Sequence, residues 1–206
     1  MELQHPLGVV TGGVDGDILH VLASVDGEFS APQLHRILPW RSLAGIRYAL
    51  DRLVDQGIVL TRTVGRARTY TFNKRHLAAD AIRALAAQKS ALLSRLRDGL
   101  ASWPTPPIYA ALYGSAARSD MTVDSDLDIL LIRDDSAGPA WLDDSAALAE
   151  AVTAWTGNDA RIVDLHVDDL DDDAMQSFLS NIVAEGVTLS GESDWLASRL
   201  RRRQAS

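Results

Sequence analysis

The sequence predicts an α+β protein of two domains that are joined by a long helix. Three observations predict this class. Helical and strand periodicities alternate along the 206 residues, prolines cluster at residues 104–107, and the charge is unevenly distributed. Residues 1–102 carry a net charge of +4, whereas residues 103–206 carry −12. The first half therefore suits a polyanion, and the second would repel one unless cations intervene.

The composition excludes several classes of protein. With 47% hydrophobic and 23% charged residues, the chain is typical of a globular protein. No apolar stretch approaches the ~20 residues that a membrane-spanning helix needs. The lack of cysteine excludes disulfides and cysteine-ligated zinc. The first residues, MELQHPLGVV, do not have the pattern of a signal peptide, so we expect a cytoplasmic protein without membrane contact.

The first 75 residues predict three helices followed by a two-stranded hairpin. Apolar residues at helical spacing predict helices at residues 15–24, 30–38 and 43–56. Ser30 and Ser42 are the expected N-caps of the second and third helices. Two β-rich runs, residues 58–64 and 67–73, meet at a Gly-Arg pair and predict the hairpin.

A long helical pattern then leads to the second domain. Apolar residues recur at helical spacing from residue 76 to residue 103, and the prolines that follow cannot continue a helix. We therefore divide the chain into residues 1–75, a connecting helix at residues 76–103, and residues 104–206. Two alternatives stay open for the connecting helix, which either mediates a homodimer or packs between the domains.

Strands and helices alternate in the second domain. Strands are predicted at residues 108–113, 126–132 and 161–167, and helices at residues 140–155 and 174–185. This alternation is typical of an α/β domain, in which helices cover a sheet.

Residues 10–75 resemble the winged helix-turn-helix family, because three helices are followed by a two-stranded wing. In that family the third helix lies in the DNA major groove and the wing contacts a backbone or minor groove. The resemblance implies DNA contacts from the third helix and the wing tip, namely Arg41, Arg47, Tyr48, Arg52, Arg66 and Arg68. Two alternatives are a solvated face, partly neutralised by neighbouring aspartates, and a protein-interaction module.

Two carboxylates interrupt the apolar strand DLDILLI at residues 126–132. Residues two apart on a strand point to the same face, so Asp126 and Asp128 project together. Two carboxylates this close repel one another unless a cation lies between them, and hard oxygen ligands favour Mg²⁺. Because Mg²⁺ keeps part of its coordination shell for substrate phosphates, this pair predicts a triphosphate ligand.

A glycine, a serine and a further acid complete the candidate site. Gly114 lets the backbone approach a phosphate closely, and N–H groups near Ser115 can bind phosphate oxygens. Arg118 and Ser119 follow one turn later and are further candidates for phosphate contacts. Asp164 interrupts the apolar strand at residues 161–167, as Asp126 interrupts the strand at residues 126–132. We therefore expect Asp164 to complete the site of a second ion, which would activate an acceptor hydroxyl.

The arrangement Gly-Ser-x10-Asp-x-Asp resembles the polymerase-β-like nucleotidyltransferase superfamily, particularly the minimal nucleotidyltransferases, over residues 108–189. The resemblance implies a mixed sheet, a third strand acid at Asp164, and two Mg²⁺ (or Mn²⁺) ions. It also implies transfer of a nucleoside monophosphate from ATP or another NTP to a hydroxyl of a protein, an RNA or a small molecule.

Three alternatives stay open. Some small members of the superfamily are antitoxins that nucleotidylate a partner toxin, although an attached winged helix departs from their minimal form. A second is a transcriptional regulator or antitoxin whose nucleotidyltransferase-like domain senses nucleotide without catalysis. In the third, the carboxylates lie at a strand edge and pair only with nearby arginines.

Overall fold

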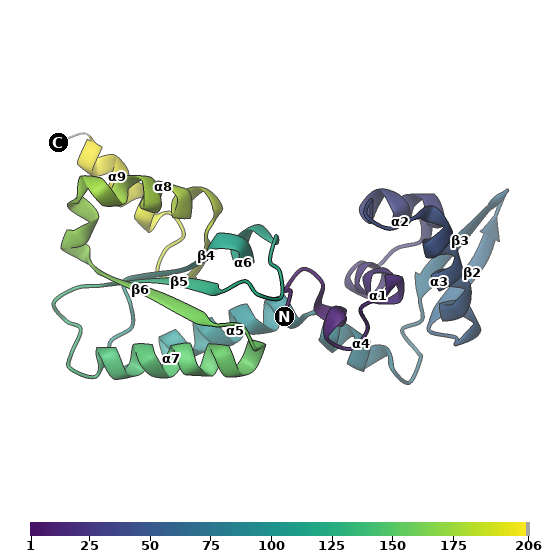
Figure 1. Ribbon diagram of the computed structural model, residues 1–206, viewed down its shortest axis with the longest axis horizontal. Helices are drawn as coiled ribbons and strands as arrows, with labels where there is room; N and C mark the ends of the chain where they lie inside the picture. The colour runs from purple at the N-terminus through teal and green to yellow at the C-terminus, as the bar shows by residue number, and fades with distance from the viewer. Residues whose placement is uncertain (205–206) are drawn as a thin grey trace. The chain divides into compact units, whose positions relative to one another are not determined.

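The computed structural model describes residues 1–204 and divides into two compact units (Figure 1). One unit comprises residues 2–90, and the other comprises Met1 and the chain from Ala91 onward. None of the helices in the described range is long and apolar enough to cross a membrane.

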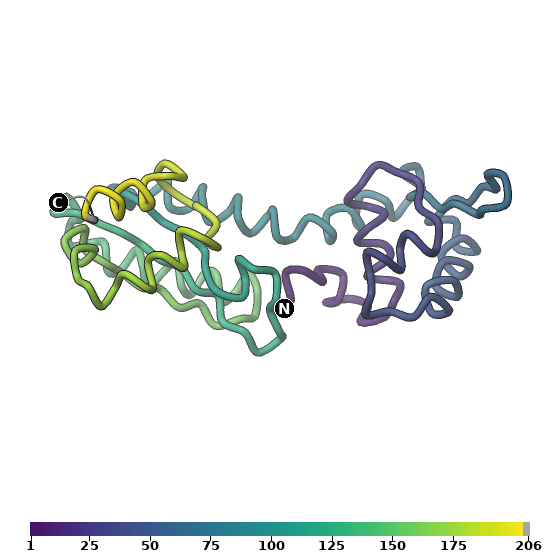
Figure 2. The backbone as a smooth tube through the Cα atoms, turned by 90° about the horizontal axis from the view of Figure 1, so that it is seen from above, coloured from purple at the N-terminus to yellow at the C-terminus, as the bar shows by residue number. Residues whose placement is uncertain are grey.

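The N-terminal unit contains the three helices and the hairpin that the sequence predicts. Its elements are η1 (Pro6–Val9), α1 (Val14–Ser24), β1 (Phe29–Ser30), α2 (Ala31–Ile37), α3 (Leu43–Asp55), β2 (Val59–Val64), β3 (Ala67–Phe72) and α4 (Ala79–Ala86). The strands form an antiparallel sheet in the order β1-β3-β2, and Figure 2 shows the β2–β3 hairpin extending beyond the helices of this unit. The short elements β1 and η1 were not predicted from the sequence. The winged-helix assignment stays a prediction.

Local signals explain where these elements begin. Ser30 and Gln33 form a capping box at the start of α2, in which the Ser30 amide donates to Oε1 of Gln33 at 2.7 Å. The Ser42 hydroxyl accepts from the Gly45 amide at 3.1 Å and caps α3. Gly65, at the hairpin turn, has a φ of +63°, which a glycine adopts without steric cost.

The helix predicted at residues 76–103 is two helices, α4 and α5 (Gln88–Ala101). The apolar residues of α4 pack in the core of the N-terminal unit, so this segment belongs to that unit and is not a separate connector. In α5 the buried residues are Leu92, Leu96 and Leu100. After Leu85 the helical spacing meets Gln88 and Lys89 before it returns to Leu92. Because alanine, glutamine and lysine all favour helix, the sequence does not reveal the break at Ala87.

The C-terminal unit is a mixed four-stranded sheet between two layers of helices. Besides α5, its elements are β4 (Tyr109–Tyr113), α6 (Gly114–Arg118), β5 (Leu127–Arg133), α7 (Trp141–Thr156), β6 (Ala160–His166), η2 (Val167–Asp171), η3 (Asp173–Met175), α8 (Gln176–Glu185), β7 (Val187–Ser190) and α9 (Trp195–Gln204). The strand order is β6-β5-β4-β7, with β5 and β6 parallel and the other pairs antiparallel. In Figure 1, α5 and α7 cover one face and α8 and α9 cover the other.

The core packing shows which strand residues point to which face. The residues that pack with α8 and α9 are Tyr109 and Ala111 of β4, Leu130 and Ile132 of β5, and Leu165 of β6. Because strand side chains alternate, odd-numbered residues of β4 and β6 and even-numbered residues of β5 share this face. This alternation determines to which face of the sheet each candidate site residue points.

Candidate functional site

A glycine turn joins β4 to the short helix α6 beside the first motif carboxylate. Gly114 has a φ of +69°, a conformation that glycine adopts far more readily than other residues. A Cβ atom at this position would lie 2.6 Å from Oδ2 of Asp128. Glycine therefore allows both the chain reversal into α6 and the close approach of the carboxylate to the backbone.

Asp128 and Asp126 lie on the same side of the sheet, as the sequence predicts. Asp128 pairs with Tyr113 across the antiparallel strands, and Asp126 precedes β5 by one residue. Burial raises the pKa of Asp128, and the negative charge of Asp126 raises it further, whereas Arg161 and Arg118 lower it. Burial and the charge of Asp128 also raise the pKa of Tyr113. Like charges in a partly buried place indicate a site that a cation would stabilise.

The predicted phosphate-binding residues lie in and directly after α6, which follows the glycine turn. Ser115 lies in the first turn of α6, and its carbonyl accepts from the backbone amide of Ser119, which has a left-handed φ of +64°. Arg118 donates from Nε to Oδ2 of Asp120 at 3.0 Å and from Nη1 to Oε2 of Glu185 at 3.1 Å. The positive charge of Arg118 lowers the pKa of Asp128, but Asp120 and Glu185 are its direct partners.

Asp164 does not join the other two carboxylates. In the parallel pair of β5 and β6, Asp164 lies beside Leu131, an odd-numbered residue of β5. Its neighbours Val163 and Leu165 pack on the α8–α9 face, so Asp164 points to the opposite face from Asp128. There Nε of Arg133 donates to its Oδ2 at 3.2 Å. The expected convergence of three carboxylates is wrong, because a shift of one position along a strand changes the face.

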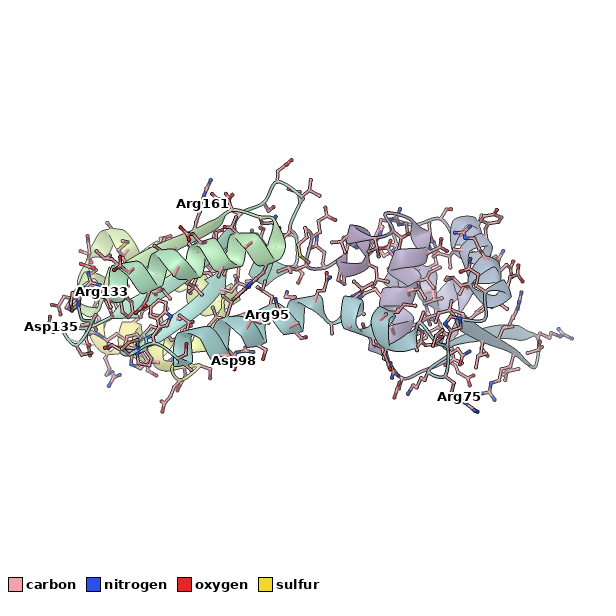
Figure 3. All side chains as sticks on the ribbon, turned by 90° about the horizontal axis from the view of Figure 1, so that it is seen from below. Arg75, Arg95, Asp98, Arg133, Asp135 and Arg161 are labelled. Carbon is pink, nitrogen blue, oxygen red and sulfur yellow. The ribbon has the colours of Figure 1, made fainter. Side chains whose placement is uncertain are left out.

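Arg161 occupies the β6 position beside Asp128. It pairs with Asp128 in the strand register, and its Nη1 lies 2.8 Å from Oδ2 of Asp126. Figure 3 shows Arg161 well away from Arg133, which lies near Asp135. Arg161 is not among the residues predicted from the sequence, because only the register between β5 and β6 reveals its neighbours. Among residues 1–204, no group of three histidine, aspartate or glutamate side chains is arranged to hold a metal ion.

Three of the arginines predicted to contact DNA form ion pairs within the N-terminal unit. Nε of Arg41 lies 2.6 Å from Oδ2 of Asp17, whose side chain is only 8% exposed. Because a buried carboxylate requires a donor, Arg41 has a structural role that the sequence analysis did not expect. The other two pairs are Arg52 with Asp15, and Arg68 with Asp51 at 2.7 Å.

The other predicted DNA contacts are exposed. Tyr48 is 72% exposed, with the guanidinium carbon of Arg52 5.0 Å from its ring centroid. Arg47 on α3 and Arg66 at the hairpin tip are exposed, and no ion pair among the described residues engages either. These three residues are the part of the predicted surface that remains available to a ligand.

Residues 62–156 match the protein family described as "Putative nucleotidyltransferase DUF294". This stretch contains Gly114, Ser115, Asp126 and Asp128, and it ends before β6. No curated protein matches the chain.

The chain is also similar to solved structures. A crystal structure of a toxin-antitoxin with AMP-PNP has 18% sequence identity and a TM-score of 0.39. A mutant of the toxin-antitoxin MntA-HpeT has 17% identity and a TM-score of 0.38. Each similarity covers 57% of this chain and 84% of the other. Both TM-scores are below 0.5, so these similarities carry no argument about function.

Proposed function

We propose that the C-terminal unit is a metal-dependent nucleotidyltransferase that transfers a nucleoside monophosphate from an NTP to an acceptor hydroxyl. One observation carries the proposal. The carboxylate of Asp128 lies against the glycine turn at Gly114, and the like-charged Asp126 lies on the same side of the sheet. This arrangement suits a cation and the phosphates it binds. The nucleotidyltransferase family match supports the reaction class.

The residues present fit one Mg²⁺ ion. In proteins Mg²⁺ is commonly bound by one or two carboxylates together with substrate phosphates, and Asp126 and Asp128 would be those carboxylates. The burial and mutual repulsion that raise the pKa of Asp128 would both be relieved by a bound cation. When bound, the ion would neutralise negative charge that develops on the phosphates.

The chain's own residues would mainly position the substrate. The backbone at Gly114 and Ser115 would bind the β- and γ-phosphates, and Arg118 and Ser119 would lie beside them. The acceptor oxygen would attack the α-phosphorus and form a new P–O bond, while the bond to the bridging oxygen breaks and pyrophosphate leaves. The acceptor loses its proton to solvent or base. Alignment and charge neutralisation supply the rate enhancement in such a reaction.

Transfer of label from α-labelled NTPs tests the proposal. Wild-type protein, incubated with cell lysate and each α-labelled NTP, should label an acceptor that is a protein, an RNA or a small molecule. Asp128→Asn should reduce labelling by about 100-fold or more, because it removes a charge that holds the ion. Asp164→Asn, on the other face of the sheet, is the matched control and should retain labelling. Equal labelling by wild type and Asp128→Asn would overturn the proposal.

A second candidate function is nucleotide sensing without catalysis, in a transcriptional regulator or an antitoxin. It is favoured by the separation of Asp164 from the motif carboxylates and by the ion pair between Arg161 and Asp126. An NTP and Mg²⁺ would then change the affinity of the protein for DNA, and no acceptor would become labelled. The N-terminal unit would supply the DNA contacts through Arg47, Tyr48 and Arg66.

A further inference from the structure

Arg161 stands where an acidic ligand for a second metal ion would be needed. Of the β6 residues, the one beside Asp128 in the strand register is Arg161, and both side chains share the α8–α9 face. Asp164 is three residues further along β6 and points to the other face. The neighbouring strand therefore brings a positive charge to the motif carboxylates, and not a third negative one.

Contacts hold the guanidinium of Arg161 beside the motif. Its Nη1 lies 2.8 Å from Oδ2 of Asp126, and its Nε lies 3.7 Å from Oδ2 of Asp159. Although the side chain is 63% exposed, its nearest partner is a motif carboxylate whose own exposure is 28%. The ion pair therefore belongs to the candidate site.

Charge decides what such a site can bind. In two-metal sites the ions lie roughly 3.5–4 Å apart, which requires enough carboxylates to neutralise both. Arginine stays protonated in proteins and has no acceptor atom, so Arg161 cannot be a ligand and repels a cation. Its planar guanidinium can bind either carboxylate or phosphate oxygens.

We infer that the site binds one divalent ion together with the substrate's phosphates. Where a two-metal site would hold its second ion, Arg161 supplies the positive charge instead. This inference rests on the function proposed above. Arg161 is thus a substrate-facing residue of the site, and its role differs from that of an ordinary surface ion pair.

Counting bound ions tests the inference without measuring activity. The full chain is dialysed to equilibrium against Mn²⁺ and inorganic triphosphate, which carries the phosphates of an NTP without a base, and bound Mn²⁺ is measured by electron paramagnetic resonance. Wild-type protein should bind one Mn²⁺ per chain. Arg161→Asp, which places a third carboxylate beside Asp128, should bind two. Asp164→Asn should bind one, as the wild type does.

The outcomes separate this inference from the proposed function. Two Mn²⁺ ions in the wild type, reduced to one in Asp164→Asn, would overturn the inference and leave the nucleotidyltransferase proposal standing. No bound Mn²⁺ in the wild type would contradict both. If the Arg161→Asp variant is folded and still binds only one ion, Arg161 does not lie where a second metal ion would bind. If thermal unfolding shows that Arg161→Asp is not folded, Arg161→Glu supplies the same charge and should gain the second ion.

Discussion

Asp128 and Asp164 each interrupt an apolar strand of the same sheet, yet their surroundings differ. Asp128 lies against a glycine turn beside a second carboxylate, and burial together with that neighbour raises its pKa. Asp164 receives a hydrogen bond from Arg133 at 3.2 Å. The fold thus supplies a direct partner for Oδ2 of Asp164, although its buried Oδ1 has none among the described residues. At Asp128, burial and repulsion by Asp126 outweigh the positive charges of Arg161 and Arg118. At Asp128 this burial and repulsion indicate a ligand site, and Asp126 shares that site although Arg161 pairs with it at 2.8 Å.

The arginines of the N-terminal unit also differ in whether an acid within the fold pairs with their charge. Arg41 is held by the buried Asp17, whereas Arg66 lies exposed at the hairpin tip without an ion pair among the described residues. A charge already compensated inside the fold has less to gain from a ligand. Substitutions at both kinds of residue test whether this distinction separates functional from structural charges.

The largest effect is expected from Gly114→Ala. The added Cβ would lie 2.6 Å from Oδ2 of Asp128 and would displace that carboxylate. Because a misplacement of about 1 Å at a reacting site can cost roughly 100-fold in rate, nucleotidyl transfer should fall by about that factor. The measurement is the rate of label transfer from an α-labelled NTP.

Gly157→Ala is the matched control for this variant. Gly157 has a similar φ, +73°, but a Cβ added there would have no neighbouring atom within 4 Å. Both variants should lose about 1–2 kcal/mol of unfolding free energy, because both force alanine into a left-handed conformation. Only Gly114→Ala should lose transfer. If Gly157→Ala reduced transfer equally, backbone strain and not the position of Asp128 would explain the loss.

Opposite changes in stability are expected from Asp164→Asn and Asp128→Asn without divalent ions. Asp164→Asn removes the charge that pairs with Arg133, whose side chain is 36% exposed against 22% for Asp164, and should lower the unfolding free energy by about 1 kcal/mol after solvent screening. Asp128→Asn removes a carboxylate whose folded-state pKa is raised. It should therefore raise the melting temperature at neutral pH. Thermal and urea unfolding measure both effects.

The pH dependence of the unfolding free energy shows whether the charge of Asp128 stabilises or destabilises the fold. A raised folded-state pKa means that the folded protein holds the proton more tightly than the unfolded chain. Ionised Asp128 therefore destabilises the fold above its folded pKa, and this cost disappears as the pH falls below its unfolded pKa. The difference in unfolding free energy between Asp128→Asn and the wild type should therefore shrink as the pH falls. Mg²⁺ should stabilise the wild type more than it stabilises the variant. A wild type more stable than Asp128→Asn at neutral pH without Mg²⁺ would contradict this account.

Local sequence signals predicted much of the fold and the placement of Gly114, Asp126 and Asp128. The two-residue period of a strand placed Asp126 and Asp128 together, and the conformational freedom of glycine predicted a turn at Gly114. Caps such as Ser42 marked the beginnings of helices. These features depend on residues within a few positions of one another, so a single sequence displays them.

The features that the sequence could not predict depend on distant partners. Whether Asp164 or Arg161 faces Asp128 is decided by the register of β5 against β6, two strands that are far apart along the chain. The role of Arg41, which precedes α3, depends on Asp17, a buried residue of α1. The break at Ala87 depends on which core each half of an apolar stripe joins.

The smallest effect is expected from single arginine substitutions in the N-terminal unit, on the salt dependence of DNA binding. If its exposed arginines contact phosphates, the affinity for duplex DNA should fall with rising salt, because each contact releases counterions. Arg66→Ala should reduce the slope of log Kd against log salt by about 1, since it removes one phosphate contact. Arg68→Ala should reduce it less, because Asp51 already pairs with Arg68 at 2.7 Å. Titrations of the full chain at several salt concentrations measure both slopes. Equal slopes for wild type and Arg66→Ala would place the DNA contacts elsewhere, and a larger change for Arg68→Ala would show that an ion pair within the fold does not keep an arginine from a ligand.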